Sequence, residues 1–275
     1  MELNFTKMQA AGNDYIYVYG KPCDKEKIVR ACDRRNGIGG DGVVFYEKTD
    51  GGCYSFEIFN ADGSEAEFCG NASLTLAKIL LCGSVAEQLN AAPECIKERV
   101  KKLKFITRAG VRDVETIGEK AFLAAPLPVK INVEFARALC AKTIAGAKVL
   151  SAGVFSAGNL HLAVRAEKAT RETAEEISAT AEKCGEFPLG VNVEVFSLTE
   201  RGAQAVVKER GSGFTGSCGS GALCIYSLFE ECASAKNGLK ILFEGGELTV
   251  LKRDEKLLLC GCPKVVFKGE SEWLL

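Results

Sequence analysis

Glu67-Phe68-Cys69-Gly70-Asn71-Ala72 is answered about 150 residues later by Gly216-Ser217-Cys218-Gly219-Ser220-Gly221-Ala222, and such self-similarity is typical of a duplicated structural unit. An apolar run follows each Cys-Gly motif, Ser73 to Leu81 in the first half and Ala222 to Glu230 in the second. Because these runs are apolar on nearly all sides, they predict helices buried within their own halves. Each cysteine is therefore expected at the N-terminus of a buried helix.

Two further echoes occur in the same order along the chain. The segment Ala11-Gly12-Asn13-Asp14-Tyr15-Ile16-Tyr17-Val18 is matched by Ala157-Gly158-Asn159-Leu160-His161-Leu162-Ala163-Val164. The residues Gly39, Asp41, Val44 and Phe45 are matched by Gly190, Asn192, Val195 and Phe196. Three matches in one order at a nearly constant separation predict two related halves.

The remaining pattern is that of a mixed α+β protein. Short β-rich runs precede the cysteine motifs at Tyr15 to Tyr19, Val43 to Glu47 and Val191 to Phe196, and others follow the helices at Leu103 to Thr107 and Leu239 to Phe243. The segment from Ala124 to Lys130 holds two of the six prolines and is a plausible crossing between the halves. We expect two α+β domains with an active cleft between them.

Composition restricts the partners. Lysine plus arginine (35) nearly balances aspartate plus glutamate (36) over 275 residues, so no long-range field favours nucleic acid or an anionic membrane surface. The first residues lack a basic segment followed by an apolar run, and no stretch reaches the ~18 apolar residues of a membrane span. We therefore expect a cytoplasmic protein with a small-molecule partner.

The thirteen cysteines do not predict a metal site or a disulfide framework, because their number is odd and the only close pair is Cys260 and Cys262. The two glycine-flanked cysteines are different. A thiol at a helix N-terminus lies beside unpaired backbone N–H groups, which favour the thiolate, lower its pKa and bind carboxylates. Cys69 and Cys218 would then act as a pair, one removing an amino-acid α-proton and the other delivering a proton to the opposite face, without a cofactor or metal.

The residues around these motifs resemble the diaminopimelate epimerase family over nearly the whole chain. The resemblance is strongest from Phe59 to Asn71, FNADGSEAEFCGN. It extends to five other stretches: Phe5 to Gln9 with Gly12 to Asp14, Gly37 to Gly42, Gly158 to His161, Val191 to Glu194, and Glu209 to Gly213. It implies two pseudo-symmetric domains, each a β-barrel-like sheet around a central helix, comprising residues 1–118 with 263–275 and residues 119–262. It also implies a homodimer that converts LL-diaminopimelate to the meso form in lysine and peptidoglycan precursor biosynthesis.

The resemblance also implies roles for individual residues. Asn60, Asn159 and Asn192 would hold the distal amino-carboxylate end of the substrate, and Arg210 would pair with a substrate carboxylate. Glu209 would neutralise an ammonium group, and Asn13 would approach the reacting centre. The helix starts would contribute Gly70, Asn71, Gly219 and Ser220.

The sequence departs from the family pattern at three places. Ala72-Ser73-Leu74-Thr75 replaces the usual Gly-x-Arg-Cys, Phe214 replaces a glutamate, and Leu160 replaces a proline. A racemase of another amino acid, such as histidine, remains an alternative, and so does a catalytically silent amino-acid-binding protein. The single histidine, His161, also allows a Cys-His dyad, but that reading leaves the second cysteine motif unexplained.

Overall fold

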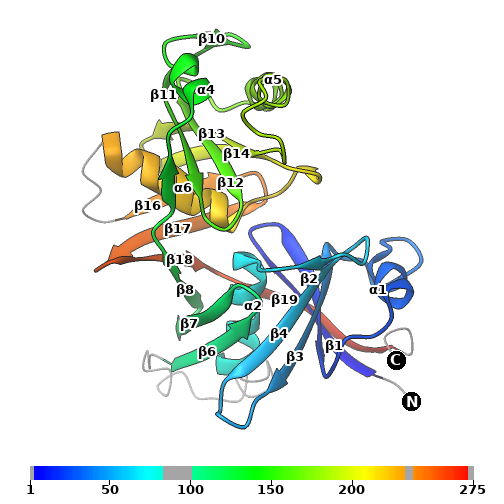
Figure 1. The fold of residues 1–275 in the computed structure, drawn as a ribbon. Coiled ribbons are helices and arrows are strands. Elements are labelled where there is room, and N and C mark those ends of the chain that lie inside the picture. Colours follow the sequence, from blue (N-terminus) through cyan, green and yellow to red (C-terminus); the bar gives the residue numbers. More distant parts are fainter. Residues whose placement is uncertain (1–2, 83–100, 233–237, 272–275) are drawn as a thin grey trace. The chain divides into compact units, whose positions relative to one another are not determined.

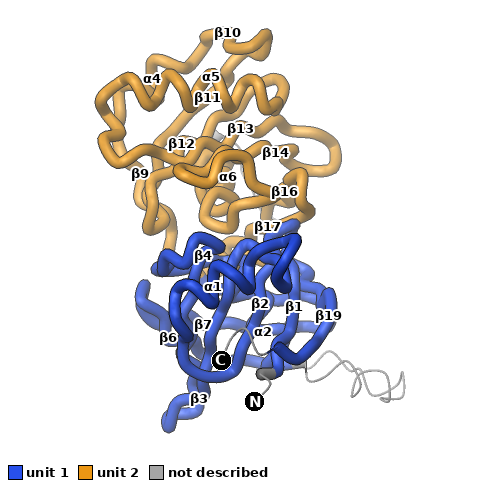
Figure 2. Tube along the Cα trace, turned by 90° about the vertical axis from the view of Figure 1, so that its right-hand side faces the viewer, with its two compact units in different colours: residues 1–124, 261–275 blue, residues 125–260 orange. Residues whose placement is uncertain are grey.

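The computed structural model describes residues 3–82, 101–232 and 238–271. They form two compact units, residues 1–124 with 261–275 and residues 125–260, which are coloured separately in Figure 2. The chain passes from one unit to the other at Ala124–Ala125 and returns at Cys260–Gly261, a few residues from the boundaries expected from the sequence. No helix in the described part of the chain is long and apolar enough to span a membrane.

The described part of unit 1 is a sheet with one internal helix and one short outer helix (Figure 1). Its strands are β1 (Leu3–Ala10), β2 (Asn13–Tyr19), β3 (Gly42–Lys48), β4 (Tyr54–Asn60), β5 (Glu65–Ala66), β6 (Lys101–Thr107), β7 (Gly110–Ile117), β8 (Lys120–Pro126) and β19 (Lys264–Ser271). Its helices are α1 (Lys25–Cys32) and α2 (Gly70–Cys82).

Unit 2 has the same plan with additional short elements. Its strands are β9 (Val129–Ile131), β10 (Thr143–Ile144), β11 (Ala147–Ser156), β12 (Leu160–Ala166), β13 (Asn192–Thr199), β14 (Gly202–Glu209), β15 (Gly213–Phe214), β16 (Leu239–Phe243), β17 (Gly246–Arg253) and β18 (Lys256–Gly261). Its helices are α4 (Glu134–Leu139), α5 (Arg171–Ala181) and α6 (Gly219–Cys232).

The strand pairings repeat in order, which confirms the predicted duplication. In unit 1, β1 pairs with β19 and β2, β2 runs parallel to β3, β3 pairs with β4, β4 runs parallel to β6, and β7 pairs with β6 and β8. In unit 2, β11 pairs with β9 and β12, β12 runs parallel to β13, β13 pairs with β14, β14 runs parallel to β16, and β17 pairs with β16 and β18. A parallel pair requires a crossover, and α1 and α5 lie in equivalent crossovers.

One predicted match is displaced by a residue. The parallel register places Tyr15 opposite Gly42 in unit 1 and His161 opposite Asn192 in unit 2, so Asn192 corresponds to Gly42 rather than to Asp41. Gly39 and Gly190 do correspond, because both have positive φ angles, 79° and 77°. The loop of unit 1 therefore holds one more residue between its glycine turn and the strand.

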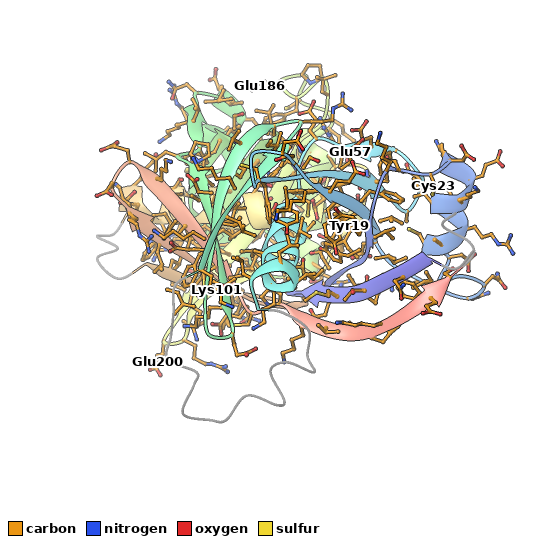
Figure 3. The ribbon with its side chains drawn as sticks, turned by 90° about the horizontal axis from the view of Figure 1, so that it is seen from below. Tyr19, Cys23, Glu57, Lys101, Glu186 and Glu200 are labelled. Carbon is orange, nitrogen blue, oxygen red and sulfur yellow. The ribbon has the colours of Figure 1, made fainter. Side chains whose placement is uncertain are left out.

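Each sheet surrounds its central helix, as predicted. Helix α2 contacts β1, β2, β6 and β7, and helix α6 contacts β11, β12, β13 and β17. Most apolar side chains of α2 are buried, with Leu74 and Leu76 fully inaccessible, whereas Ile79 and Leu80 are partly exposed. Lys101 of β6 donates to the carbonyl oxygen of Leu81 at 2.6 Å, so a cation lies at the negative end of α2 (Figure 3).

Candidate active site

Cys69 is the residue that caps α2. Its carbonyl oxygen accepts the backbone N–H of Ser73 at 3.0 Å, and its sulfur accepts the N–H of Ala72 at 3.5 Å. The thiol is half-buried, and the hydroxyl of Tyr15 lies 3.4 Å from the sulfur. Burial, and after it the neighbouring Cys69, raises the pKa of Tyr15 well above its usual value, so the phenol stays protonated. A protonated phenol beside the sulfur can stabilise a thiolate by donating a hydrogen bond.

Asn13 and Asn71 meet beside this thiol. Asn71, in the first turn of α2 after Gly70, donates its side-chain amide to the Asn13 side-chain oxygen at 2.8 Å. Asn13 in turn reaches the Asp41 carboxylate at 3.5 Å. The structure thus brings together three of the predicted site residues, Cys69, Asn13 and Asn71.

A charged network holds the strand that carries Asn13. Asp14 pairs with Lys7 at 2.7 Å and with Arg34 at 2.6 Å, and Arg34 also pairs with Asp41 at 2.8 Å. Burial raises the pKa of Asp14, but hydrogen bonds and charge from Arg34 and Lys7 outweigh it and bring the pKa down to about 2. Asp14 is therefore ionised and anchors the start of β2 at neutral pH.

Asn60 lies at the end of β4, exposed, and its side chain donates to the Ser64 hydroxyl at 3.0 Å. This side-chain hydrogen bond stays within the loop that follows β4 and does not reach Cys69. The departures after the first cysteine lie inside α2: Ser73 and Thr75 donate to the carbonyl oxygens of Cys69 and Asn71, at 2.8 and 2.5 Å. These hydroxyls are therefore satisfied within the helix.

Cys218 caps α6 in the same way. Its carbonyl oxygen accepts the N–H of Ala222 at 2.9 Å, and its sulfur accepts the N–H of Gly221 at 3.4 Å. Ser220, which follows Gly219 in the first turn, has its hydroxyl 3.4 Å from the sulfur. Cys218 is only 6% exposed, so the two thiols occupy equivalent places but differ in burial.

The expectation that both thiol pKa values are lowered is wrong for Cys218. Burial raises its pKa well above the usual value, and the carboxylates of Glu209 and Glu194 raise it further. The hydrogen bonds with Ser220 and with the Gly221 N–H lower it but do not compensate. Desolvation of the charged form outweighs the helix start here, so Cys218 is protonated in the substrate-free protein.

Glu209 is a neighbour of this thiol. Burial raises its pKa, a hydrogen bond from the Thr215 hydroxyl (2.5 Å) lowers it, Glu194 raises it and a hydrogen bond with Cys218 lowers it. A carboxyl group in contact with the thiol can help to move the Cys218 proton.

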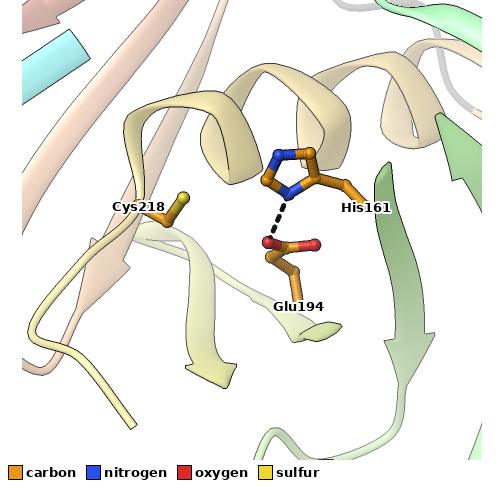
Figure 4. A group of neighbouring side chains, drawn as sticks. All are labelled: His161, Glu194 and Cys218. Carbon is orange, nitrogen blue, oxygen red and sulfur yellow. Dashed lines mark hydrogen bonds and ion pairs between the residues drawn. The ribbon is translucent and has the colours of Figure 1, made fainter. Parts of the chain in front are cut away.

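His161 and Glu194 complete the surroundings of Cys218. Nδ1 of His161 is hydrogen-bonded to Oε1 of Glu194 at 2.7 Å, and both side chains are fully buried. The sulfur of Cys218 lies within 4.8 Å of this pair (Figure 4). The hydrogen-bond partner of His161 is therefore Glu194, and within the described residues no hydrogen bond joins His161 to a cysteine as the Cys-His dyad would require.

Asn192 and Arg210 are linked, whereas Asn159 is exposed in the loop before β12. The Asn192 side chain donates to the Leu160 carbonyl oxygen at 3.0 Å and accepts the Arg210 backbone N–H at 2.9 Å. The Arg210 guanidinium donates to the Leu189 carbonyl oxygen at 2.7 Å and remains exposed. Asn192 thus positions the backbone of Arg210.

A cavity of about 190 Å³ lies beside these residues in unit 2. Its lining includes Lys208, Glu209 and Arg210, but Cys218 does not line it. Phe214, which replaces the family's glutamate, lies under the Arg171 guanidinium, whose central carbon is 4.9 Å from the ring centroid, so it has a stacking partner of its own.

The sequence did not predict that Tyr15 and Glu194 lie near the two thiols, and it gave His161 no role in the site. One signal was available: Tyr15 and His161 are echo positions, and in the structure each lies near the cysteine of its own unit. Glu194 belongs to the stretch from Val191 to Glu194 that resembles the family, but only Asn192 of that stretch was assigned a role, because the position of Glu194 depends on the register between β12 and β13.

Known structures share this fold at low sequence identity. A phenazine biosynthesis protein of the PhzF family from Bacillus anthracis matches with a TM-score of 0.69 at 14% identity, covering 98% of this chain and 99% of that one. A hydroxyproline epimerase from Agrobacterium vitis, solved with bound trans-4-hydroxy-L-proline, matches with a TM-score of 0.61 at 11% identity, covering 98% and 92%.

Sequence relatives are closer. The family model described as diaminopimelate epimerase matches residues 5–121. A diaminopimelate epimerase from Caldanaerobacter subterraneus is 29% identical over 98% of this chain and 100% of its own length. Another, from Parabacteroides distasonis, is 30% identical over 97% of each chain. The chain belongs to the diaminopimelate epimerase family.

Proposed function

We propose that this protein converts LL-2,6-diaminopimelate to meso-diaminopimelate without a cofactor, using Cys69 and Cys218 as its paired acid and base. One observation carries the proposal: each cysteine caps a buried helix at the same place in two units that share one pairing order. Inversion at an α-carbon requires a base on one face and an acid on the other. A duplicated thiol site supplies both groups.

The reaction follows from the two thiol environments. Cys218, whose pKa is raised by burial and by Glu209 and Glu194, starts as the thiol and is the proton donor in one direction. Cys69, with the Tyr15 hydroxyl beside its sulfur, removes the α-proton in that direction. The roles exchange in reverse. Backbone N–H groups at Gly70, Asn71, Gly219 and Ser220 stabilise the charge that develops on the substrate carboxylate.

The distal end of the substrate is held by the polar side chains that the family resemblance indicates. The side chains of Asn60, Asn159 and Arg210 are exposed, so a substrate can reach them. Asn192 contributes by fixing the Arg210 backbone, since both ends of its amide are bonded to main-chain atoms. Glu209 neutralises the ammonium group. An arginine fork matches a second carboxylate, which favours diaminopimelate over amino acids that lack one.

Proton exchange in deuterium oxide tests this function. The reduced protein, dialysed against a chelator, should incorporate solvent deuterium into the α-position of LL-diaminopimelate and yield the meso isomer, as read by mass spectrometry and chiral chromatography. The Cys69→Ala and Cys218→Ala variants should lose turnover by orders of magnitude. Cys224→Ser, which changes another buried thiol of α6, is the matched control and should keep it.

The outcomes separate the chemistry from the substrate. Deuterium in another amino acid, and none in diaminopimelate, would show the racemase alternative to be right. Binding of an amino acid without exchange would show a silent binding protein.

We also propose a homodimer with an amino-acid ligand, which the family resemblance supports. The nearly balanced charge supports a cytoplasmic protein with neither a nucleic-acid nor a membrane partner. Light scattering coupled to size-exclusion chromatography should give twice the mass of one chain. A mass of one chain at micromolar concentration would contradict the dimer.

A further inference from the structure

Three side chains with metal-ligating atoms meet at the start of α6. His161 comes from β12, Glu194 from β13 and Cys218 from the cap of the helix, and one ligand atom of each lies within 4.8 Å of the others (Figure 4). Their exposed fractions are 0%, 0% and 6%. A cation bound here would be shielded from bulk water on most sides.

Two of these side chains have buried polar atoms that lack a hydrogen-bond partner among the described residues. His161 and Glu194 share one hydrogen bond, while Nε2 of His161 and Oε2 of Glu194 have no hydrogen-bond partner among the described residues. Buried polar atoms are nearly always paired, and an unpaired one points to a further ligand such as water or an ion. Both unpaired atoms belong to the same three-residue cluster.

The donor set selects the ion. An imidazole nitrogen, a carboxylate oxygen and a thiolate sulfur are the ligands that Zn²⁺ accepts, and three protein ligands leave a fourth position for water. We propose that His161, Glu194 and Cys218 bind Zn²⁺ and that this binding inhibits the enzyme by occupying the Cys218 sulfur. The binding site is independent of the proposed function; the inhibition rests on it.

The local charges suit such an ion. The carboxylates of Glu194 and Glu209, which disfavour a bare thiolate, attract a divalent cation, and the cation in turn stabilises the thiolate. On binding, the thiol proton of Cys218 leaves to solvent, and the thiolate keeps its hydrogen bond from the Gly221 N–H. Nδ1 and Oε1 face each other at 2.7 Å, closer than the about 3.3 Å between two ligands at tetrahedral zinc. On binding, the imidazole or the carboxylate therefore turns, so that one of the unpaired atoms, Nε2 or Oε2, replaces one of them at the metal.

Unit 1 provides an internal control. Tyr15 occupies the position of His161 and contacts Cys69 through its hydroxyl. Its raised pKa, caused first by burial, keeps the phenol protonated, and a protonated phenol does not ligate zinc. Among the described residues, a cluster of three metal-ligating side chains is therefore found at the α6 thiol but not at the α2 thiol.

Cobalt titration tests the site directly, because Co²⁺ takes the place of Zn²⁺ and absorbs light. The reduced, metal-free protein should bind one Co²⁺ with the intense visible bands of a tetrahedral site and a near-ultraviolet thiolate-to-cobalt band, both abolished by Zn²⁺. Cys218→Ser should lose the thiolate band. His161→Asn and Glu194→Gln should weaken binding at least about tenfold. Cys69→Ser and Cys224→Ser should retain the spectrum.

The controls make the outcome decisive. Circular dichroism would verify that each variant is folded, and Glu194→Gln and Cys218→Ser retain the size of the original side chains. Weak octahedral bands in the wild-type protein, or a thiolate band that survives in Cys218→Ser, would overturn the proposal. Zn²⁺ should also stop proton exchange, with EDTA restoring it. If no amino acid exchanges at all, the proposed function fails, yet the cobalt spectrum still decides the site.

Discussion

At the residue scale, the two thiols have the same backbone setting but different neighbours. Cys69 has a protonated phenol, Tyr15, at its sulfur, whereas Cys218 has Glu209 in hydrogen-bond contact and the His161–Glu194 pair nearby. The helix start contributes one N–H to each sulfur. The difference in chemistry between the two sites therefore comes from side chains on the strands.

Replacing Glu209 by glutamine should make Cys218 more reactive as a nucleophile. Removing a carboxylate that raises the thiol pKa lowers that pKa, so the thiolate forms at lower pH than in the wild-type protein. The rate of Cys218 alkylation by iodoacetamide, followed by peptide mass spectrometry across pH, should rise at a lower pH. Glu200→Gln, in an exposed turn, should leave the profile unchanged. A profile moved to higher pH would show that Glu209 instead stabilises the thiolate.

The sequence could predict where the thiols lie but not what surrounds them. Cys-Gly before an apolar run places each sulfur at a helix start by local chain geometry alone. The pKa of Cys218 depends on burial and on Glu194, two consequences of tertiary packing. Asn192 is similar, because only the folded chain shows that its amide is already bonded at both ends.

At the element scale, the first turn of α6 lies tightly against β13. A Cβ added at Gly221 would be 2.6 Å from Oε1 of Glu194 and 2.9 Å from its Cδ and Cγ. Glu194 is fully buried, and its Oε1 is held by the hydrogen bond with Nδ1 of His161. In α2 the equivalent residue is Ala72, and the strand opposite carries no such glutamate. The glycine at this turn is thus required by the Glu194 side chain.

Gly221→Ala should destabilise the protein although alanine is the better helix former. The intrinsic gain of up to about 1 kcal/mol is outweighed by overpacking, which costs about 1–3 kcal/mol. Urea unfolding should show a lower free energy of unfolding for the variant. Gly51→Ala, where a Cβ meets no atom within 4 Å, is the control and should change little. Equal or higher stability for Gly221→Ala would mean that Glu194 does not pack against this turn.

At the scale of the whole molecule, the duplication was the most predictable feature. Short matches such as Ala11-Gly12-Asn13 with Ala157-Gly158-Asn159 correspond to equivalent turns and strands because each unit repeats the same pairings. The strands that follow the two crossings of the chain between the units, β9 beside β11 and β19 beside β1, carry no such match. These two strands need only to pair with the edge of a sheet, so their sequences are little constrained, and comparing the two halves of the sequence does not reveal them.

The two-base mechanism makes a prediction for the molecule as a whole, because it requires the thiols of both units to act on opposite faces of one carbon. Elimination from a β-halogenated diaminopimelate analogue needs proton removal but no delivery to the far face, so one intact thiolate suffices. Cys69→Ser and Cys218→Ser should each process one stereoisomer and spare the other, with opposite preferences, while both lose epimerisation by orders of magnitude. The rate of elimination is measured from the halide released into solution. The control variant Cys224→Ser should process both isomers as the wild type does. If both catalytic variants retain the same isomer, the thiols do not act on opposite faces and the mechanism is wrong.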